Sequence, residues 1–151
     1  LFVCVSESKG RRRRKIMKLT EDNYTEIAEK AIKALLQEKN RRGNTVAPVE
    51  PVTTSKIRSL LAMTADIYND VINLQEEKLP ADIIGRIKYM KIRFIYEAGR
   101  DRELKVKKLV EEAELIEHLD EIGNSRKQYI LFSRYMEALV AYRKFYYEKD
   151  E

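Results

Sequence analysis

Apolar side chains recur at intervals of three and four residues through five separate stretches of this 151-residue chain. This spacing places them on one face of an α-helix, whereas a half-buried strand would need alternation at every second residue. The five stretches cover roughly residues 20–42, 53–78, 80–98, 101–119 and 126–147. Five glycines and three prolines are too few for the many turns of a sheet protein. The sequence therefore predicts an all-α fold, a single compact bundle of about five helices.

Residues that favour helix ends stand at the borders of these stretches. Thr20, Thr53 and Ser125 each precede an apolar stripe and predict three N-caps. Pro80 predicts the start of the third helix, because the first turn does not use the N–H that proline lacks. Gly99 predicts where that helix ends.

The net charge of +5 is concentrated at the start of the chain. Residues 1–16 carry six Lys and Arg side chains against Glu7, so the remaining residues are neutral overall. The run Arg11–Arg14 is compatible with an arm that binds nucleic acid and also with a leader outside the fold. We favour a disordered or non-native leader, with Met17 as the start of the protein. Evidence for nucleic-acid binding must then come from local charge.

The residue types needed for catalysis or metal binding do not converge in this sequence. Cys4 is the only cysteine, which excludes an intrachain disulfide and suits a reducing, cytoplasmic location. His118 is the only histidine, and a metal pair with Glu114 would lack further His or Cys ligands. The acidic neighbours of His118 instead predict a solvated face that raises the proton affinity of its imidazole. No Gly-rich phosphate loop and no apolar run of about 18 residues occurs, so we predict no catalytic residue, metal, cofactor or membrane segment.

The third expected helix carries basic and aromatic side chains along one side. We call them the Arg–Tyr row, which consists of Arg86, Tyr89, Arg93, Tyr96 and Arg100. The arginines are seven residues apart and therefore lie on one line of the helix. Guanidinium groups pair with phosphates and tyrosines stack on bases or ribose, so the row suits a nucleic-acid backbone. The alternative is surface pairing of Arg93 with Glu97, with the tyrosines packed against a neighbouring helix.

Charge and aromatic residues are also segregated along the chain. Residues 84–108 hold nine basic and three acidic residues, whereas residues 109–124 hold six acids and no Lys or Arg. Such patches would let copies of the chain stack head to tail, and the alternative is two ordinary solvated faces. Phe145, Tyr146 and Tyr147 are consecutive and cannot all face one core, so we expect some of them to meet a partner.

Three segments resemble the small subunit of the type III-A (Csm) CRISPR RNA-guided complex. Residues 134–146, RYMEALVAYRKFY, are similar to the C-terminal YFEALVAYHK(F/Y)YG of that family. Residues 53–58, TTSKIR, resemble its TTS(Q/K)(I/L)R helix start, and residues 89–100, YMKIRFIYEAGR, resemble its L-x-Y-x-x-G-R helix end. The match extends over about residues 53–147. Met136 replaces the usual Phe, Arg143 replaces the usual His, and Tyr147 stands where the terminal Gly would be.

The resemblance implies a helical bundle that repeats along the inner filament of the complex. Such subunits contact the guide RNA–target RNA duplex mainly at phosphate and sugar, as a protein that accepts any guide sequence must. They cleave nothing, because target cleavage belongs to the backbone subunit and the polymerase and DNase activities to the large subunit. The implied partners are guide RNA, target RNA, the backbone and large subunits, and other copies of the chain.

The resemblance assigns RNA contacts to basic residues within and beside the matching motifs. These are Lys56, Arg58, Lys88, Lys91, Arg93 and Arg100. Arg86 joins them by the geometry of the Arg–Tyr row, and Arg126, Lys127 and Arg134 are weaker candidates. Lys91 falls within the apolar stripe by angle, so an ion pair or a snorkelling side chain is its alternative.

The expected organisation is a leader, one helical domain and a tail. The boundaries are 1–18 for the leader, 19–147 for the bundle and 148–151 for an acidic tail. Within the bundle, 19–42 form the first helix, 43–52 a linker and 53–147 the part that carries the resemblance. The competing functions are a helical protein–protein adaptor or self-assembling bundle without a nucleic-acid role and, less favoured, an enzyme.

Overall fold

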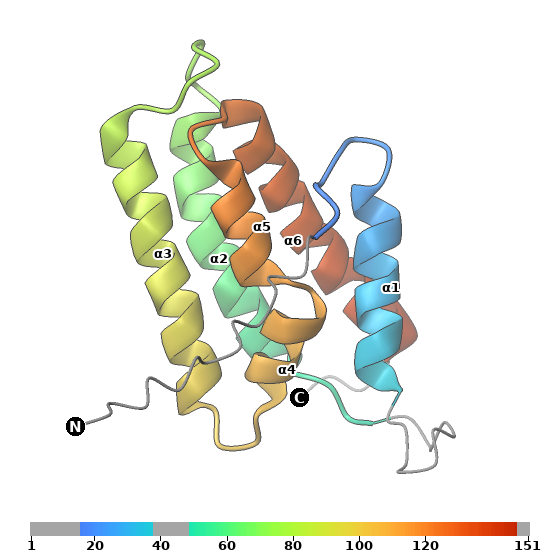
Figure 1. Ribbon diagram of the computed structural model, residues 1–151. Helices are drawn as coiled ribbons and strands as arrows, with labels where there is room; N and C mark the ends of the chain where they lie inside the picture. Colours follow the sequence, from blue (N-terminus) through green and yellow to red (C-terminus); the bar gives the residue numbers. More distant parts are fainter. Residues whose placement is uncertain (1–15, 38–48, 148–151) are drawn as a thin grey trace, which may run out of the picture.

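The computed structural model describes residues 16–37 and 49–147, and this part of the chain forms six α-helices and no strand (Figure 1). The helices are α1 (Tyr24–Leu36), α2 (Thr54–Val71), α3 (Ala81–Arg100), α4 (Lys105–Glu112), α5 (Leu115–Ile122) and α6 (Arg126–Tyr146). The all-α prediction is confirmed. The basic run of the leader, most of the linker and the acidic tail lie outside the described residues. None of the six helices has the length and apolar character needed to cross a membrane.

The helix expected over residues 101–119 is instead two short helices, α4 and α5. Glu114 between them has a φ of 51°, a left-handed conformation that a continuous α-helix does not contain. Ala113 and Leu115 on either side of it are both buried. The break therefore turns the apolar sides of both short helices toward the core. No Gly or Pro marks this position in the sequence, so periodicity alone predicted one helix.

Two of the three predicted side-chain caps are confirmed. The Thr53 hydroxyl accepts a 3.3 Å hydrogen bond from the Lys56 N–H at the start of α2. The Ser125 hydroxyl accepts a 3.2 Å bond from the Gln128 N–H at the start of α6. Each cap satisfies one of the N–H groups that the first turn of a helix leaves unpaired.

Four predicted helix borders are wrong. Helix α1 ends at Leu36 and helix α2 ends at Val71, before the expected residues 42 and 78. Helix α1 begins one turn after Thr20, because Asn23 is the N-cap and its side-chain oxygen accepts a 2.7 Å bond from the Thr20 N–H. Helix α3 runs through Gly99 and ends at Arg100. Gly99 keeps helical geometry here, because the tertiary contacts of α3 outweigh the modest helical cost of a glycine.

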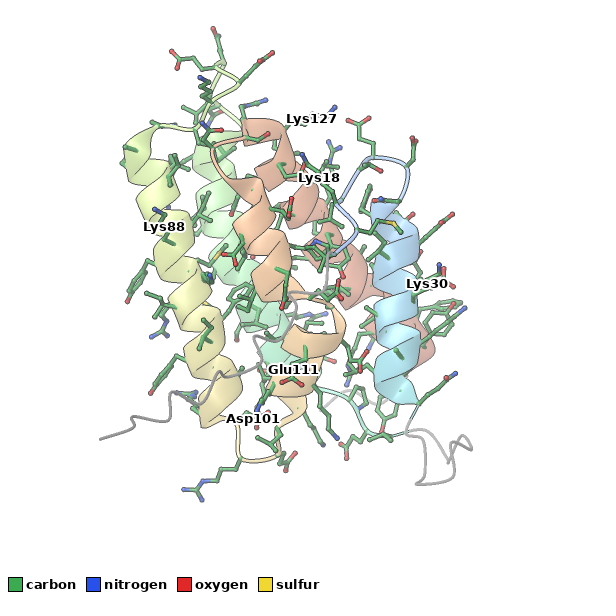
Figure 2. All side chains as sticks on the ribbon, in the orientation of Figure 1. Lys18, Lys30, Lys88, Asp101, Glu111 and Lys127 are labelled. Atoms are coloured by element: carbon green, nitrogen blue, oxygen red, sulfur yellow. The ribbon has the colours of Figure 1, made fainter. Side chains whose placement is uncertain are left out.

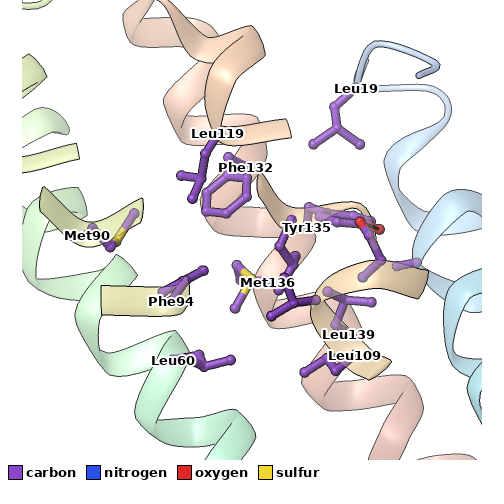
Figure 3. Close-up of a cluster of buried hydrophobic side chains, with 14 of the residues drawn as sticks. Leu19, Leu60, Met90, Phe94, Leu109, Leu119, Phe132, Tyr135, Met136 and Leu139 are labelled. Atoms are coloured by element: carbon purple, nitrogen blue, oxygen red, sulfur yellow. Dashed lines mark hydrogen bonds between the residues drawn. The ribbon is translucent and has the colours of Figure 1, made fainter. Parts of the chain in front are cut away.

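Helix α6 forms the centre of the core. It packs against α1, α2 and α5, and its fully buried side chains include Tyr129, Phe132, Tyr135, Met136 and Leu139. Figure 3 shows several of them meeting Leu60 of α2, Met90 and Phe94 of α3, Leu109 of α4 and Leu119 of α5. The core thus draws on helices from the whole described part of the chain.

The two buried tyrosine hydroxyls of α6 bind backbone oxygens. Tyr129 donates to Thr64 at 2.7 Å, and Tyr135 donates to Ala113 at 2.8 Å. Burial raises the pKa of both phenols above its ordinary value. Each hydroxyl therefore stays protonated and fixes the position of a neighbouring helix.

Helix α3 lies at one side of the bundle, and α1 lies at the opposite side (Figure 1). Helix α3 contacts α2, α4 and α5 through its apolar stripe of Ile83, Ile87, Met90, Phe94 and Ala98, which are all buried. This placement leaves the other side of α3 open to solvent.

Candidate nucleic-acid interface

The outer side of α3 carries large side chains that this chain leaves uncovered. Tyr89, Ile92 and Tyr96 are 64%, 60% and 54% exposed. The alternative in which these tyrosines pack against a neighbouring helix of the same chain is therefore wrong. Both rings are available to a partner, and both belong to the Arg–Tyr row.

Two hollows lie between α2 and α3, and Tyr89 lines one of them. One hollow of about 550 Å³ lies beside Met63 and Asp66 of α2 and Arg86, Tyr89 and Arg93 of α3. A second hollow of about 530 Å³ lies between the start of α2 and the end of α3, beside Lys56, Glu97 and Arg100. We call these two hollows together the α2–α3 groove. Four of the five members of the Arg–Tyr row line this groove, and Tyr96 does not.

The first arginine of the row is held by two carboxylates of α2. Arg86 lies 2.5 Å from Asp70 and 3.4 Å from Asp66, measured from guanidinium nitrogen to carboxylate oxygen. Sequence reasoning missed these partners, because they lie on another helix, 16 and 20 residues away.

The other two arginines share one carboxylate on their own helix. Glu97 lies 3.5 Å from Arg93 through Oε1 and 3.3 Å from Arg100 through Oε2. The predicted pairing of Arg93 with Glu97 is confirmed. The guanidinium of Arg93 also lies 5.6 Å from the centre of the Tyr96 ring, within the range of a cation–π contact.

Lys56 is tied to an acid that the sequence analysis did not single out. Its ammonium lies 2.9 Å from Asp101 Oδ1, and Asp101 Oδ2 accepts a 3.0 Å bond from the Val106 N–H. The Val106 N–H and, secondarily, the Lys56 ammonium lower the pKa of Asp101, against the opposing effect of burial. An aspartate just before a helix is the available sequence signal for such a role.

Lys91 pairs with Asp120 of α5 at 2.6 Å. This confirms the alternative in which Lys91 forms an ion pair within the chain. The pair also joins the basic stretch to the acidic stretch inside one molecule. Because α3 packs against α5, the two charge patches are neighbours and partly neutralise each other.

Of the remaining candidates, one donates hydrogen bonds to backbone oxygens and four are exposed cations. Arg126 donates to the last carbonyls near the end of α2, Val71 at 3.2 Å and Ile72 at 3.1 Å. The exposed cations are Arg58, Lys88, Lys127 and Arg134. None of the four has an ion-pair partner among residues 16–37 and 49–147. They do not gather at one place, since Lys88 lies on α3 and Lys127 at the start of α6 (Figure 2).

His118 is buried, which corrects the prediction of a solvated acidic face. Its side of α5 points into the core, where the imidazole meets the Tyr135 ring edge-on at 5.1 Å between centres. Neither ring nitrogen has a hydrogen-bond partner within the described structure. Burial lowers the pKa of His118 to about 4, the opposite of the expected direction. No cluster of three His, Cys, Asp or Glu side chains suited to a metal occurs in the described part.

The aromatic end of α6 is partly exposed, as its sequence predicts. Phe145 is 75% exposed and packs edge-on against Tyr146, whose hydroxyl donates to Glu29 of α1 at 2.6 Å. The three consecutive aromatics therefore do not all face the core. Their contact with a partner stays a prediction.

Comparison with known proteins gives a consistent result over most of the chain. The family model of type III-A Csm2 proteins matches residues 29–149. A Streptococcus thermophilus protein named CRISPR system Cms protein Csm2 is 42% identical over 132 residues, which cover 87% of this chain and 98% of the relative. Proteins of the same name from Mycobacterium tuberculosis and Enterococcus italicus are 36% and 33% identical. Their matches cover 89% and 80% of this chain and 100% and 86% of the relatives.

Proposed function

The chain belongs to the type III-A Csm2 family, and we propose that it is the non-catalytic small subunit of a type III-A CRISPR RNA-guided complex. In this proposal its partners are guide RNA, target RNA, the backbone and large subunits, and other copies of the same chain. The near-complete coverage of the relatives supports assigning this role to the chain as a whole.

We propose further that the α2–α3 groove binds the backbone of the guide RNA–target RNA duplex. The observation that carries this proposal is the Arg–Tyr row, because three arginines and two exposed tyrosines follow one side of α3 beside an open groove. Guanidinium groups bind phosphate, and tyrosines contact sugars and bases without reading their edges. Binding of this kind accepts any guide sequence.

The character of the groove also favours binding over catalysis. Its acids and bases neutralise each other in pairs on the surface, and the pKa of the one histidine is lowered inside the core. A catalytic acid or base would instead need a titratable group poised at the site of the chemistry.

The direct test reverses three charges of the row in the full chain, with Arg86→Glu, Arg93→Glu and Arg100→Glu. We expect weaker binding to an RNA duplex and a smaller loss of affinity with added salt, because fewer phosphates are neutralised. Fluorescence anisotropy over a salt series measures both. The matched control reverses Lys18, Lys30 and Lys107, which are exposed and lie outside the groove. Equal binding by the two folded variants would favour the adaptor function without a nucleic-acid role.

Membership of the complex has its own test. The tagged chain, purified from its native host, is expected to bring a short guide RNA and larger Cas subunits with it. Recovery of the chain without RNA and without those subunits would contradict the proposed role.

A further inference from the structure

We propose that Glu97 sets the RNA affinity of the Arg–Tyr row by competing with phosphate for Arg93 and Arg100. This inference rests on the proposed function, since it concerns the same groove. In this inference an acidic residue, and not only the cations, determines how tightly the groove binds RNA.

The geometry around Glu97 is that of one carboxylate shared by two cations. One oxygen faces Arg93 and the other faces Arg100, and the Glu97 side chain is less exposed than either arginine. Arg93 and Arg100 lie two helical turns apart, and the single acid between them offsets one of their two positive charges.

The two contacts of Glu97 are longer than the two shortest ion pairs of α3. Their distances of 3.5 and 3.3 Å exceed the 2.5 Å of Arg86 with Asp70 and the 2.6 Å of Lys91 with Asp120, and they are similar to the 3.4 Å second contact of Arg86 with Asp66. Charge-assisted hydrogen bonds are strongest at about 2.7–2.9 Å. Neither arginine holds Glu97 at such a distance, so a phosphate replaces this carboxylate more readily than it replaces Asp70 or Asp120.

The surroundings of Glu97 leave room for that exchange. Glu97 and Arg100 both line the hollow of about 530 Å³ at the end of the groove. The guanidinium of Arg93 also lies 5.6 Å from the centre of the Tyr96 ring, a contact that does not depend on the carboxylate. A phosphate that enters the groove thus finds both arginines in place.

Competition of this kind gives a single copy of the chain a low affinity for RNA. Several copies along one duplex would still bind strongly, because linked weak contacts act at a high effective concentration. Glu97 thereby favours RNA that is held by an assembled array over RNA that meets an isolated subunit.

The test replaces Glu97 with its neutral isostere, Glu97→Gln, in the full chain. We expect binding to an RNA duplex to become about two- to fivefold tighter, the change that corresponds to losing a competitor worth a typical exposed ion pair. The matched control is Glu26→Gln on α1, an exposed acid at the opposite side of the bundle, which alters the net charge equally. Equal affinities of the two variants overturn the inference, and so does weaker binding by Glu97→Gln.

A double-mutant cycle separates competition from a general charge effect. In an Arg93→Gln/Arg100→Gln background, Glu97→Gln should tighten binding no more than Glu26→Gln does. A gain that persists without the two arginines overturns the inference while leaving the proposed function intact. Failure of both the unmodified chain and Glu97→Gln to bind the duplex at low salt and high protein concentration would instead overturn the proposed function itself. Thermal unfolding of each variant verifies that the fold is retained.

Discussion

Arg143 Nε in α6 donates a 3.0 Å hydrogen bond to the backbone oxygen of Val52, which lies 91 residues earlier in the chain. The Arg143 side chain is almost completely buried, and a second nitrogen donates to the Tyr147 oxygen at 3.3 Å. The guanidinium therefore joins the end of α6 to the segment that leads into α2. In the sequence this arginine stands among aromatic residues near the end of α6, where nothing indicates a buried structural role.

Replacing Arg143 with Ala should lower the free energy of unfolding by about 2–4 kcal/mol. The change leaves the buried Val52 oxygen without this donor and opens a cavity. Arg134→Ala on the exposed side of the same helix is the control and should change stability by less than about 0.5 kcal/mol. Urea denaturation of both variants measures the difference. Equal stability of the two variants would mean that Arg143 has no structural role.

The buried imidazole of His118 should make the protein less stable in mild acid. The unfolded chain takes up a proton near the ordinary His pKa of 6.5, whereas the folded chain does so only near pH 4. Between these values the unfolded state binds more protons, so stability is full above about pH 6.5 and falls as the pH decreases toward 4. The expected loss between pH 7 and pH 5 is about 2 kcal/mol.

Denaturant midpoints at several pH values test this contribution. His118→Leu should flatten the pH dependence in the window between pH 4 and 6.5, because the variant has no group that titrates there at this position. An unchanged slope in the variant would assign the acid sensitivity to other groups.

Asp101→Ala should destabilise the start of α4. The substitution removes the acceptor of the Val106 N–H and the partner of Lys56, for a loss of about 1–2 kcal/mol. Asp101→Asn keeps an acceptor oxygen and should cost less. Hydrogen exchange of the Val106 amide reports the local effect, and equal protection in all three proteins would contradict it.

Gly85→Ala should stabilise the protein by about 0.5–1 kcal/mol. Gly85 lies within α3, and an added Cβ would meet no atom within 4 Å. Alanine has a higher helix propensity than glycine because it loses less backbone entropy on folding. Thermal unfolding measures the gain. A lower melting temperature would contradict the prediction and would mean that the added methyl group clashes with a neighbour.

The exposed tyrosines of α3 should matter for RNA and little for folding. Tyr96→Ala is expected to weaken binding to an RNA duplex while changing stability by less than about 0.5 kcal/mol, because the ring is more than half exposed. Phe145→Ala removes an exposed ring from α6, which is not part of the Arg–Tyr row, and serves as the control. Equal RNA affinity of the two variants would remove Tyr96 from the proposed interface.

Local features of the sequence predicted the helices well. The apolar spacing located α1, α2, α3 and α6, and Thr53 and Ser125 cap the helices that they precede. The break at Glu114 escaped prediction because its left-handed backbone arises from packing on both sides and not from a glycine or proline. The acidic neighbours of His118 were misleading for a related reason, since they lie on the outer side of α5 while the imidazole points inward.

The sequence by itself determined the helical class and the family, because periodicity and short motifs are properties of neighbouring residues. It also contained the Arg–Tyr row, since residues seven apart always share one side of a helix. Apart from the pairing of Arg93 with Glu97 within α3, only the tertiary structure decided which charges are paired and which are buried. The partners of Arg86 lie on α2, that of Lys91 on α5, and that of Arg143 before α2. Such contacts depend on which helices lie side by side, because hydrogen bonds and close ion pairs need their atoms within a few ångströms whatever the distance along the chain.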